Sequence, residues 1–593
     1  MNIYLTKIKE HKQTNKNLKR NLFIIIALRF LLFSSLTFLI FKYESLSKIL
    51  FFTLVGFFLI VFIFIFKIHS KLKNKLLLTQ NLIQINQKEY DFLTENKKPF
   101  SNGAQWIDPT HNYTFDLDIF GESSLFHYLN RCASILGERN LAQKLSSGLG
   151  ENEITANQSA IQELSKKIDF RQFLLAHTMQ LENEEKNYQQ LLNWANKKSK
   201  FNFFFNFMLY LSPALFIISV GASVYDLRFL WLSLIAFSIN CFILLFFYKP
   251  IMNEIAQFER ISAIIQIYSQ SLSIIEKEYF NDKKLNELKQ KIQQNTFSAS
   301  QEFKQLARIF SDLEGIFNIA GALVFNGSVL YHIHIFKRLF AWKEKNVQNI
   351  EFWTAVIGEF EMLNSLANFA YNNPSYCFPH INQNNSISFE NMSHPLINTQ
   401  NRIGNTIDFN PQHFVILTGA NMSGKSTFLR ALGVNLVLAK IGSPICARHA
   451  NIQPMNILVS MRQTDSLNDG KSLFYAEILR LKHIIYNLKT EKSFVLLDEI
   501  LRGTNSEDKQ LGTQKIVEEI LNLKAFGCLA THDLVITEMA KKYPTQLANK
   551  YFETRVINNQ LAFDYRLREG ISNSKNALHL MESLGIFSTM ECK

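Results

Sequence analysis

The sequence predicts a multidomain protein with two transmembrane helical hairpins, a largely α-helical middle region and a C-terminal α/β domain. Three observations lead to this fold class. Nearly continuous apolar runs occur in two pairs, and apolar residues after the second pair recur at three- and four-residue intervals. Near the C-terminus, short β-branched runs alternate with helical stretches. At 593 residues the chain is also too long for a single hydrophobic core.

Composition supports a membrane component. Hydrophobic residues make up 47% of the chain and charged residues 19%, and there are 53 phenylalanines. The net charge of +13 would suit nucleic-acid binding. However, residues 1–75 hold 13 basic residues against Glu10 and Glu44, so 13 minus 2, or +11, lies there. The six cysteines include no Cys-x-x-Cys pair, which indicates neither a disulfide framework nor a zinc site and fits a reducing compartment.

The two apolar pairs are long enough to cross a hydrocarbon core of ~30 Å as helices. We expect spans at about 21–41 and 49–66, then at about 203–224 and 230–248. A cleaved signal peptide is the competing interpretation of the first run. It is disfavoured because the run is long, lacks a small-x-small cleavage site and leads into a second span. Basic residues flank both hairpins on the same side, which predicts a multi-pass membrane protein whose large segments face the cytoplasm.

A fifth apolar stretch runs from Ile316 to Phe336, but Asn318, Asn326, His332 and His334 interrupt it. A fifth crossing would also place the C-terminal domain on the opposite side of the membrane. We therefore expect a buried or membrane-surface helix here.

The middle of the chain has a helical pattern. After the second hairpin, an apolar stripe predicts long helices that project from the membrane; its members are Ile251, Ile255, Phe258, Ile261, Ile265, Tyr268, Leu272 and Ile275. The stretch 372–391 is rich in Asn and Gln and predicts a linker. The expected domains are 1–75 (basic N-terminus and first hairpin), 76–200 (linker and start of a helical core), 201–249 (second hairpin), 250–385 (return of the core) and 386–593 (α/β domain).

A phosphate-binding loop follows a predicted buried strand, Phe414 to Leu417 and Thr418. The next residues fit G-x-x-x-x-G-K-[ST]; they are Gly419, Ala420, Asn421, Met422, Ser423, Gly424, Lys425, Ser426 and Thr427. Glycines let the backbone N–H groups turn inward, and the following helix directs its positive end at the phosphates. The pattern predicts that Lys425 meets the β- and γ-phosphates of ATP and that Ser426 coordinates Mg²⁺.

Two further strands end in polar residues. Phe494 to Leu497 leads into Asp498 and Glu499, the Walker-B arrangement, where Asp498 would hold Mg²⁺ and Glu499 would orient or deprotonate the attacking water. The run 528–530 leads into Thr531 and His532, which places His532 where related ATPases sense the γ-phosphate. The three strand ends together predict an enzyme that binds and hydrolyses ATP.

These motifs resemble those of the MutS family of DNA mismatch-repair ATPases. The similar segments are the loop with Asn421 before Met-Ser-Gly-Lys-Ser, the run 498–504, Ala530-Thr531-His532, and the segment 472–477. Outside the ATPase, 117–131 with 137–139, 363–370 with Tyr376 and Pro379, and Ser393-His394-Pro395 resemble the family's helical core and levers and its entry into the ATPase. The resemblance covers roughly residues 113–180 and 350–586.

The resemblance implies an ABC-type ATPase domain and a homodimer with composite nucleotide sites, in which Ser472 reaches the nucleotide of the opposite subunit. Leu473 and Lys509 depart from the family's pattern. No N-terminal mismatch-recognition domain and no Phe-x-Glu wedge is recognisable, and the second hairpin falls where the family's levers and DNA clamp would be.

The family implies that ATP turnover is coupled to mismatched or structured DNA and to DNA repair. The alternative is a membrane-associated ATPase for signalling or remodelling without DNA binding. It is favoured by the near-neutral charge beyond residue 75. An ABC-type transporter is a third reading, disfavoured by the four spans and by Ser472-Leu-Phe in place of a Leu-Ser-Gly-Gly signature.

Overall fold

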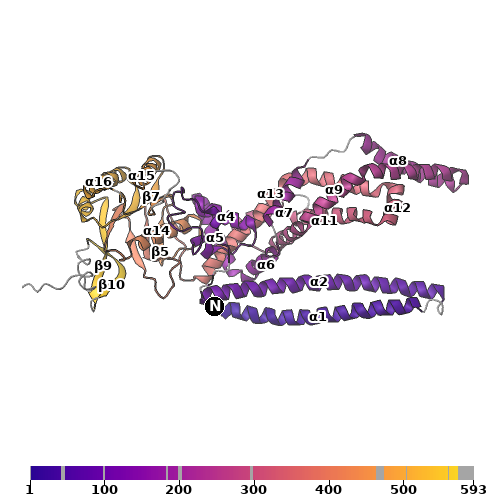
Figure 1. The fold of residues 1–593 in the computed structure, drawn as a ribbon, viewed down its shortest axis with the longest axis horizontal. Helices are drawn as coiled ribbons and strands as arrows, with labels where there is room; N and C mark the ends of the chain where they lie inside the picture. The colour runs from indigo at the N-terminus through magenta and orange to yellow at the C-terminus, as the bar shows by residue number, and fades with distance from the viewer. Residues whose placement is uncertain are drawn as a thin grey trace, which may run out of the picture.

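The computed structural model describes residues 2–41, 47–95, 97, 100–181, 184–197, 203–293, 298–462, 473–502, 504–557 and 560–571. An α/β domain lies at one end, and two helical arms extend from the middle of the molecule in the same direction (Figure 1). The first arm contains α1 (Asn2–Phe41) and α2 (Lys48–Glu95). The second ends in α8 (Phe203–Ser223), the start of α9 (Leu230–Lys277) and α12 (Ile319–Val329).

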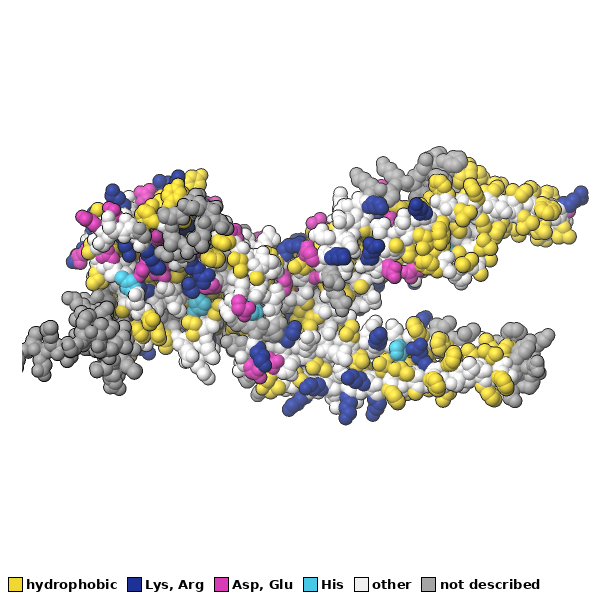
Figure 2. All heavy atoms as spheres, in the orientation of Figure 1, with side chains coloured by type: hydrophobic (Ala, Val, Ile, Leu, Met, Phe, Trp, Pro, Cys, Tyr) yellow, Lys and Arg dark blue, Asp and Glu magenta, His cyan; other side chains and the backbone are white. Residues whose placement is uncertain are grey.

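The four predicted apolar runs lie within α1, α2, α8 and α9. Among the described residues, three helices are long and apolar enough to cross a membrane, Ile3–Phe41, Thr53–Glu95 and Leu227–Lys277. The number becomes four if the bent pair Ala299–Phe317 and Ile319–Val329 forms one span, and Phe207–Ser223 is a shorter apolar helix. Hydrophobic side chains cover much of the outer part of the second arm and form patches on that of the first (Figure 2).

The expectation of one helix across 316–336 is wrong. A 3-10 turn, η4 (Gly315–Phe317), is followed by α12, which bends by 107° from the preceding helix. Asn318 caps α12, because its side chain accepts from the N–H of Gly321. Leu330 then adopts a left-handed conformation with φ of 51°, which ends α12 and starts α13 (Tyr331–Asn372) in a new direction.

The middle region is helical, as predicted. Its further helices are α3 (Leu125–Leu129), α4 (Ile135–Ser147), α5 (Glu151–Lys166), α6 (Ile168–Thr178), α7 (Glu184–Asn196), α10 (Lys283–Lys291) and α11 (Ala299–Glu314). Every residue of the stripe predicted from Ile251 to Ile275 is buried in α9. The prediction of long helices is therefore confirmed, and α9 continues without a break from the apolar run into this stripe.

The α/β domain contains a six-stranded sheet of order β10-β9-β4-β8-β7-β6. Its strands are β4 (Phe414–Thr418), β6 (Asn456–Ser460), β7 (Ser493–Asp498), β8 (Phe526–Ala530), β9 (Leu547–Ile557) and β10 (Gln560–Glu569). All neighbours pair in parallel except β10, which runs antiparallel to β9. The helices of this domain are α14 (Lys425–Lys440), α15 (Leu473–Thr490), α16 (Ser506–Asn522) and α17 (Met539–Lys542).

A second, four-stranded sheet has the order β1-β5-β2-β3. It consists of β1 (His380–Ile381), β2 (Ser388–Met392), β3 (Asn405–Asp408) and β5 (His449–Ile452). The stretch 372–391, predicted as a linker, thus holds β1 and most of β2. The polar composition led to the wrong prediction because these short strands bury few residues. Strand β2 buries only Phe389 and Met392, the two residues between them are polar and exposed, and β1 buries none.

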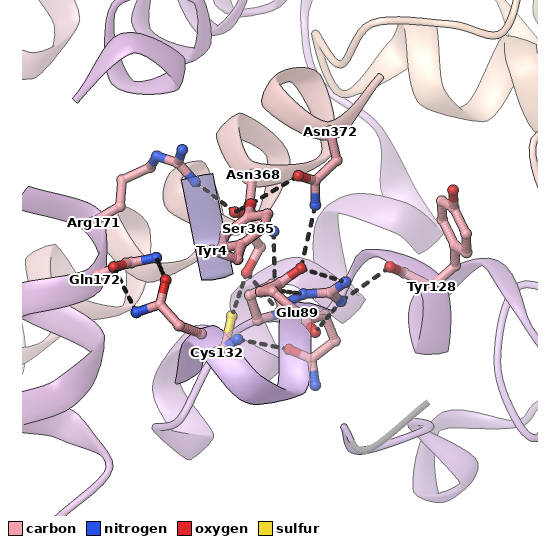
Figure 3. A network of polar contacts seen from close by, with 12 residues as sticks. Tyr4, Glu89, Tyr128, Cys132, Arg171, Gln172, Ser365, Asn368 and Asn372 are labelled. Carbon is pink, nitrogen blue, oxygen red and sulfur yellow. Dashed lines mark hydrogen bonds and ion pairs between the residues drawn. The ribbon is translucent and has the colours of Figure 1, made fainter. Parts of the chain in front are cut away.

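A buried polar joint connects the first arm to the helical core (Figure 3). Its centre is Glu89 of α2, which forms an ion pair with Arg131, and both side chains are almost fully buried. Asn368 and Asn372 of α13 donate to the two oxygens of Glu89, at 3.0 and 3.2 Å. The hydroxyl of Tyr4, on α1, donates to Asn372 at 2.7 Å. The first arm is therefore fixed to the same end of α13 that leads into the α/β domain.

Candidate functional site

Three adjacent strands bring the predicted chemistry together. Strand β4 lies beside β8, and β8 lies beside β7, all in parallel. Their carboxyl ends therefore lie at one edge of the sheet, the usual position for ligands in such folds. Gly419 follows β4, His532 lies just after β8, and β7 ends at Asp498.

The loop after β4 has the backbone that its glycines predict. Gly419 has φ of 147°, and a Cβ there would lie 2.9 Å from the carbonyl oxygen of Phe552. Gly424 has φ of 106° and caps the N-terminus of α14. Other residues rarely adopt these conformations, so the two glycines allow the loop to turn tightly before the helix. Helix α14 begins at Lys425, with its positive end toward the loop.

Lys425 is held inside this loop. Its Nζ donates to the carbonyl oxygens of Gly419 and Ala420, at 2.8 and 2.9 Å. Burial lowers the pKa of Lys425 to about 8, and nearby Glu499 and Asp498 act in the opposite direction. The ammonium group is therefore enclosed and close to its titration range, where a bound polyphosphate would favour the charged form.

Glu499 contacts two cationic or hydrogen-bonding partners. Oε1 of Glu499 lies 2.6 Å from Nε2 of His532, and Oε2 lies 3.2 Å from Nε of Arg502. The hydrogen bond from His532 is the main cause that lowers the pKa of Glu499 to about 2. Glu499 is thus ionised at neutral pH and is a weak base, which suits orienting a water molecule better than removing its proton.

A second carboxylate supports the backbone after Glu499. Glu477 of α15 accepts from the N–H of Leu501 at 2.6 Å and of Arg502 at 3.3 Å. Leu501 has φ of 60°, an uncommon conformation for leucine. Glu477 therefore positions this turn. It lies in the segment 472–477, which resembles a motif of the MutS family, although no role was predicted for Glu477 itself.

A cavity of about 820 Å³ adjoins the loop. Of the predicted site residues, it is lined by Asn421, Met422, Ser423, Gly424, Lys425, Ser426, Thr427, Asp498, Glu499 and His532. Gly419 and Ala420 contribute the carbonyl oxygens that hold Lys425. The Oγ of Ser423 is buried and has no hydrogen-bond partner among the described residues. Ser426 and Asp498 line the same cavity, so a hydroxyl and a carboxylate, the oxygen ligands that Mg²⁺ prefers, fit a magnesium nucleotide.

Other residues that line the cavity were not predicted as site residues. They include His394, Arg402 and Tyr565. Burial, followed by the nearby Arg430, lowers the pKa of His394 to about 4, so this histidine is neutral at physiological pH. Arg402 donates to the hydroxyl of Tyr376 and contacts Sγ of Cys446 at 3.1 Å. Arg402 and Tyr565 belong to no phosphate-binding pattern, so local sequence gives no signal for them.

Ser472, predicted to act on the nucleotide of a second subunit, lies outside the described residues. Its role stays a prediction.

Comparison with known proteins identifies relatives of the α/β domain. The sequence profile of the family described as MutS domain V matches residues 415–589. The chain is 31% identical over 259 residues to the DNA mismatch repair protein MutS of Streptococcus equi, covering 42% of this chain and 30% of that protein. It is 34% identical over 197 residues to the MutS protein of Thermotoga petrophila, covering 32% of this chain and 25% of that protein. The matched region thus spans less than a third of the length of these curated relatives.

Proposed function

This chain belongs to the MutS family, and from that premise we propose that it is an ATPase that binds and hydrolyses ATP at the cavity beside Lys425. The observation that carries the proposal is the convergence of Lys425, His532 and Glu499 from three neighbouring strand ends. Nε2 of His532 lies 3.3 Å from Nζ of Lys425 and 2.6 Å from Glu499. The loop that binds phosphates and the carboxylate that orients water therefore both lie beside one imidazole.

Each residue has a distinct part in the proposed reaction. The loop N–H groups and Lys425 bind the phosphates, and Lys425 exchanges its carbonyl partners for phosphate oxygens. Ser426 and Asp498 would hold Mg²⁺, which neutralises phosphate charge when bound. Glu499 orients the attacking water, and His532 keeps that carboxylate ionised and in place. ATP hydrolysis needs no further reactant than this water.

A binding experiment tests the first half of the proposal. Lys425→Ala should weaken the binding of a fluorescent ATP analogue by about 100-fold or more, because a buried charged hydrogen bond to phosphate is lost. Lys482→Ala is the matched control, since Lys482 is exposed on α15. Equal affinity of the Lys425 variant and the parent protein would remove the basis of the proposal.

We further propose that both arms anchor the protein in a membrane, with the ATPase domain in the cytoplasm. Large apolar side chains remain exposed along the outer parts of both arms, including Phe30 and Phe57 on the first and Ile218 and Phe242 on the second. Contiguous apolar surface of this extent is unusual on soluble proteins. Flotation with liposomes after detergent removal should carry the protein to the lipid fraction. Recovery in the soluble fraction as a dispersed protein would contradict the anchoring.

What ATP turnover drives has two candidate answers. The relatives are named DNA mismatch repair proteins, which supports coupling to mismatched or structured DNA in a homodimer with composite sites. The alternative is mechanical or signalling work on the membrane without DNA. It is supported by the second arm, whose outer part is covered mainly by hydrophobic side chains, with a basic side chain at its tip (Figure 2).

ATPase assays in liposomes distinguish the two. Stimulation by duplex, mismatched or branched DNA at constant lipid composition would support the first answer. Turnover that depends on lipid composition and is indifferent to all DNA forms would support the second. ATP-dependent uptake of a solute into vesicles would instead indicate the ABC-type transporter.

A further inference from the structure

We propose that α12 is a re-entrant membrane helix, which enters the bilayer beside α8 and α9 and leaves it on the same side through α13. The inference rests on the proposed membrane anchoring and adds a third intramembrane element to the second arm.

The outward surface of α12 is apolar. Ile319, Leu323, Val324 and Phe325 are exposed, the first by 82% and the others by more than half. The inward surface packs against α9, where a Cβ on Gly327 would overlap the ring of Phe237. The helix therefore continues the apolar surface that α8 and α9 expose (Figure 2).

A helix that lies on a membrane surface needs a polar face toward water. Helix α12 has none, since its sequence IAGALVFNGSV contains only Asn326 and Ser328 as polar residues. Asn326 is fully buried, and Ser328 donates to the carbonyl oxygen of Val324 within the helix. A short helix that is apolar on all sides fits acyl chains around it.

Side chains cap both ends of α12, and such partners matter most for a helix end inside hydrocarbon. At the N-terminus, Asn318 accepts from the N–H of Gly321 at 3.2 Å. At the C-terminus, the side-chain amide of Asn240 donates to the carbonyl oxygens of Gly327 at 2.8 Å and Ser328 at 3.4 Å.

Asn240 lies midway along the apolar part of α9 and is fully buried. Its Oδ1 accepts from Ser212 of α8 at 2.5 Å. The side chain of Asn326 spans the break between α12 and α13, because its Oδ1 accepts from the backbone N–H of His332 at 3.0 Å. Polar side chains in a membrane segment are costly unless they have hydrogen-bond partners. Here Asn240 bonds to the C-terminal end of α12, and Asn326 bonds to the start of α13.

The placement of Asn240 also sets the depth of α12. Residues 230–248 are the apolar part of α9, and the C-terminal end of α12 contacts Phe237 and Asn240 near its centre. The end of α12 would thus lie well inside the bilayer, whereas Lys304 on α11 is exposed to water.

Nitroxide labels can measure these depths in the full-length chain reconstituted into phosphatidylcholine and phosphatidylglycerol liposomes. Single cysteines at Val324, Leu245 and Lys304 are introduced into a chain with its native cysteines replaced, after confirming that it retains the parent ATPase rate. Leu245 is 71% exposed on α9 and serves as the lipid reference. Collision rates with oxygen and with a water-soluble nickel complex report lipid and water contact.

The ratio of the collision rate with oxygen to that with the nickel complex should be the same at Val324 as at Leu245. It should exceed the ratio at Lys304 by about tenfold or more, because the hydrocarbon core concentrates oxygen and excludes the complex. In Asn240→Leu the ratio measured at Val324 should fall toward the ratio at Lys304, because the C-terminal end of α12 loses its hydrogen-bond donor. Ile239→Leu, a neighbouring change at an exposed position of α9, should leave the ratio unchanged.

Water contact at Val324 with lipid contact at Leu245 would overturn the re-entrant helix and leave the anchoring intact. Low collision rates with both reagents at Val324 would also overturn it, because α12 would then be covered by protein, such as a second copy of the chain. Water contact at both positions would contradict the membrane anchoring itself.

Discussion

His532 contacts Glu499 through Nε2, at 2.6 Å from Oε1, and the same nitrogen lies 3.3 Å from Nζ of Lys425. The imidazole thus joins the residue expected to bind phosphate to the residue expected to orient water. For His532 to donate to Glu499, its Nε2 must carry the proton.

Replacing His532 should change the titration of Glu499. In His532→Asn the pKa of Glu499 should rise from about 2 toward its ordinary value, because its strongest hydrogen-bond donor is lost. The acid limb of ATP hydrolysis against pH should therefore move to higher pH. Turnover at neutral pH should fall about tenfold or more, because Glu499 loses the contact that holds it in place. His483→Asn, at an exposed position on α15, is the control. Superimposable acid limbs in the His532 variant and the parent would contradict this role.

Lys425 predicts a dependence of nucleotide affinity on alkaline pH. Its pKa of about 8 in the free protein should rise when phosphates surround it, so binding takes up a proton above that pH. Affinity should be constant below pH 7 and fall by up to about tenfold per pH unit above pH 8. Calorimetry at pH 8.5 in two buffers of different ionisation enthalpy measures the proton uptake directly. Proton release, or none, would show that burial does not suppress the charge of Lys425.

Sequence predicted the site more completely than the fold around it. The residues from Gly419 to Thr427, with Asp498, Glu499 and His532, were predictable because each follows a buried strand, and adjacent parallel strands bring their ends together. Arg402 was not assigned a role, because it reaches the site through tertiary contacts that no local spacing encodes. Glu477 lies in a segment that the motif singled out, but its role depends on its contact with the turn at Leu501.

The same distinction applies to the helices. The stripe of α9 follows from its periodicity, whereas the break at Leu330 depends on a left-handed backbone and on Asn240, which lies 90 positions earlier in the chain. The joint around Glu89 was also unforeseen, since Tyr4 on α1, Arg131 after α3 and Asn368 on α13 are far from Glu89 in the sequence.

The joint between the first arm and the core predicts a large loss of stability on mutation. Glu89→Gln leaves Arg131 buried without its counter-charge, which should cost about 3–5 kcal/mol. The first arm should then separate from α13 at a lower temperature in detergent. Asp169→Asn is the control, because Asp169 pairs with Lys7 while 86% exposed and such surface pairs contribute only about 0–1 kcal/mol. Equal thermal shifts in the two variants would contradict a special role for the joint.

The central claim is ATP hydrolysis at the residues around Lys425, and Glu499→Gln tests it most directly. Phosphate release by the reconstituted full-length protein should fall at least about 100-fold in this variant while ATP affinity is retained, because the loop that binds phosphates is unchanged. Glu507→Gln, exposed in the first turn of α16, should hydrolyse ATP at the parent rate. Undiminished phosphate release by Glu499→Gln would contradict the account.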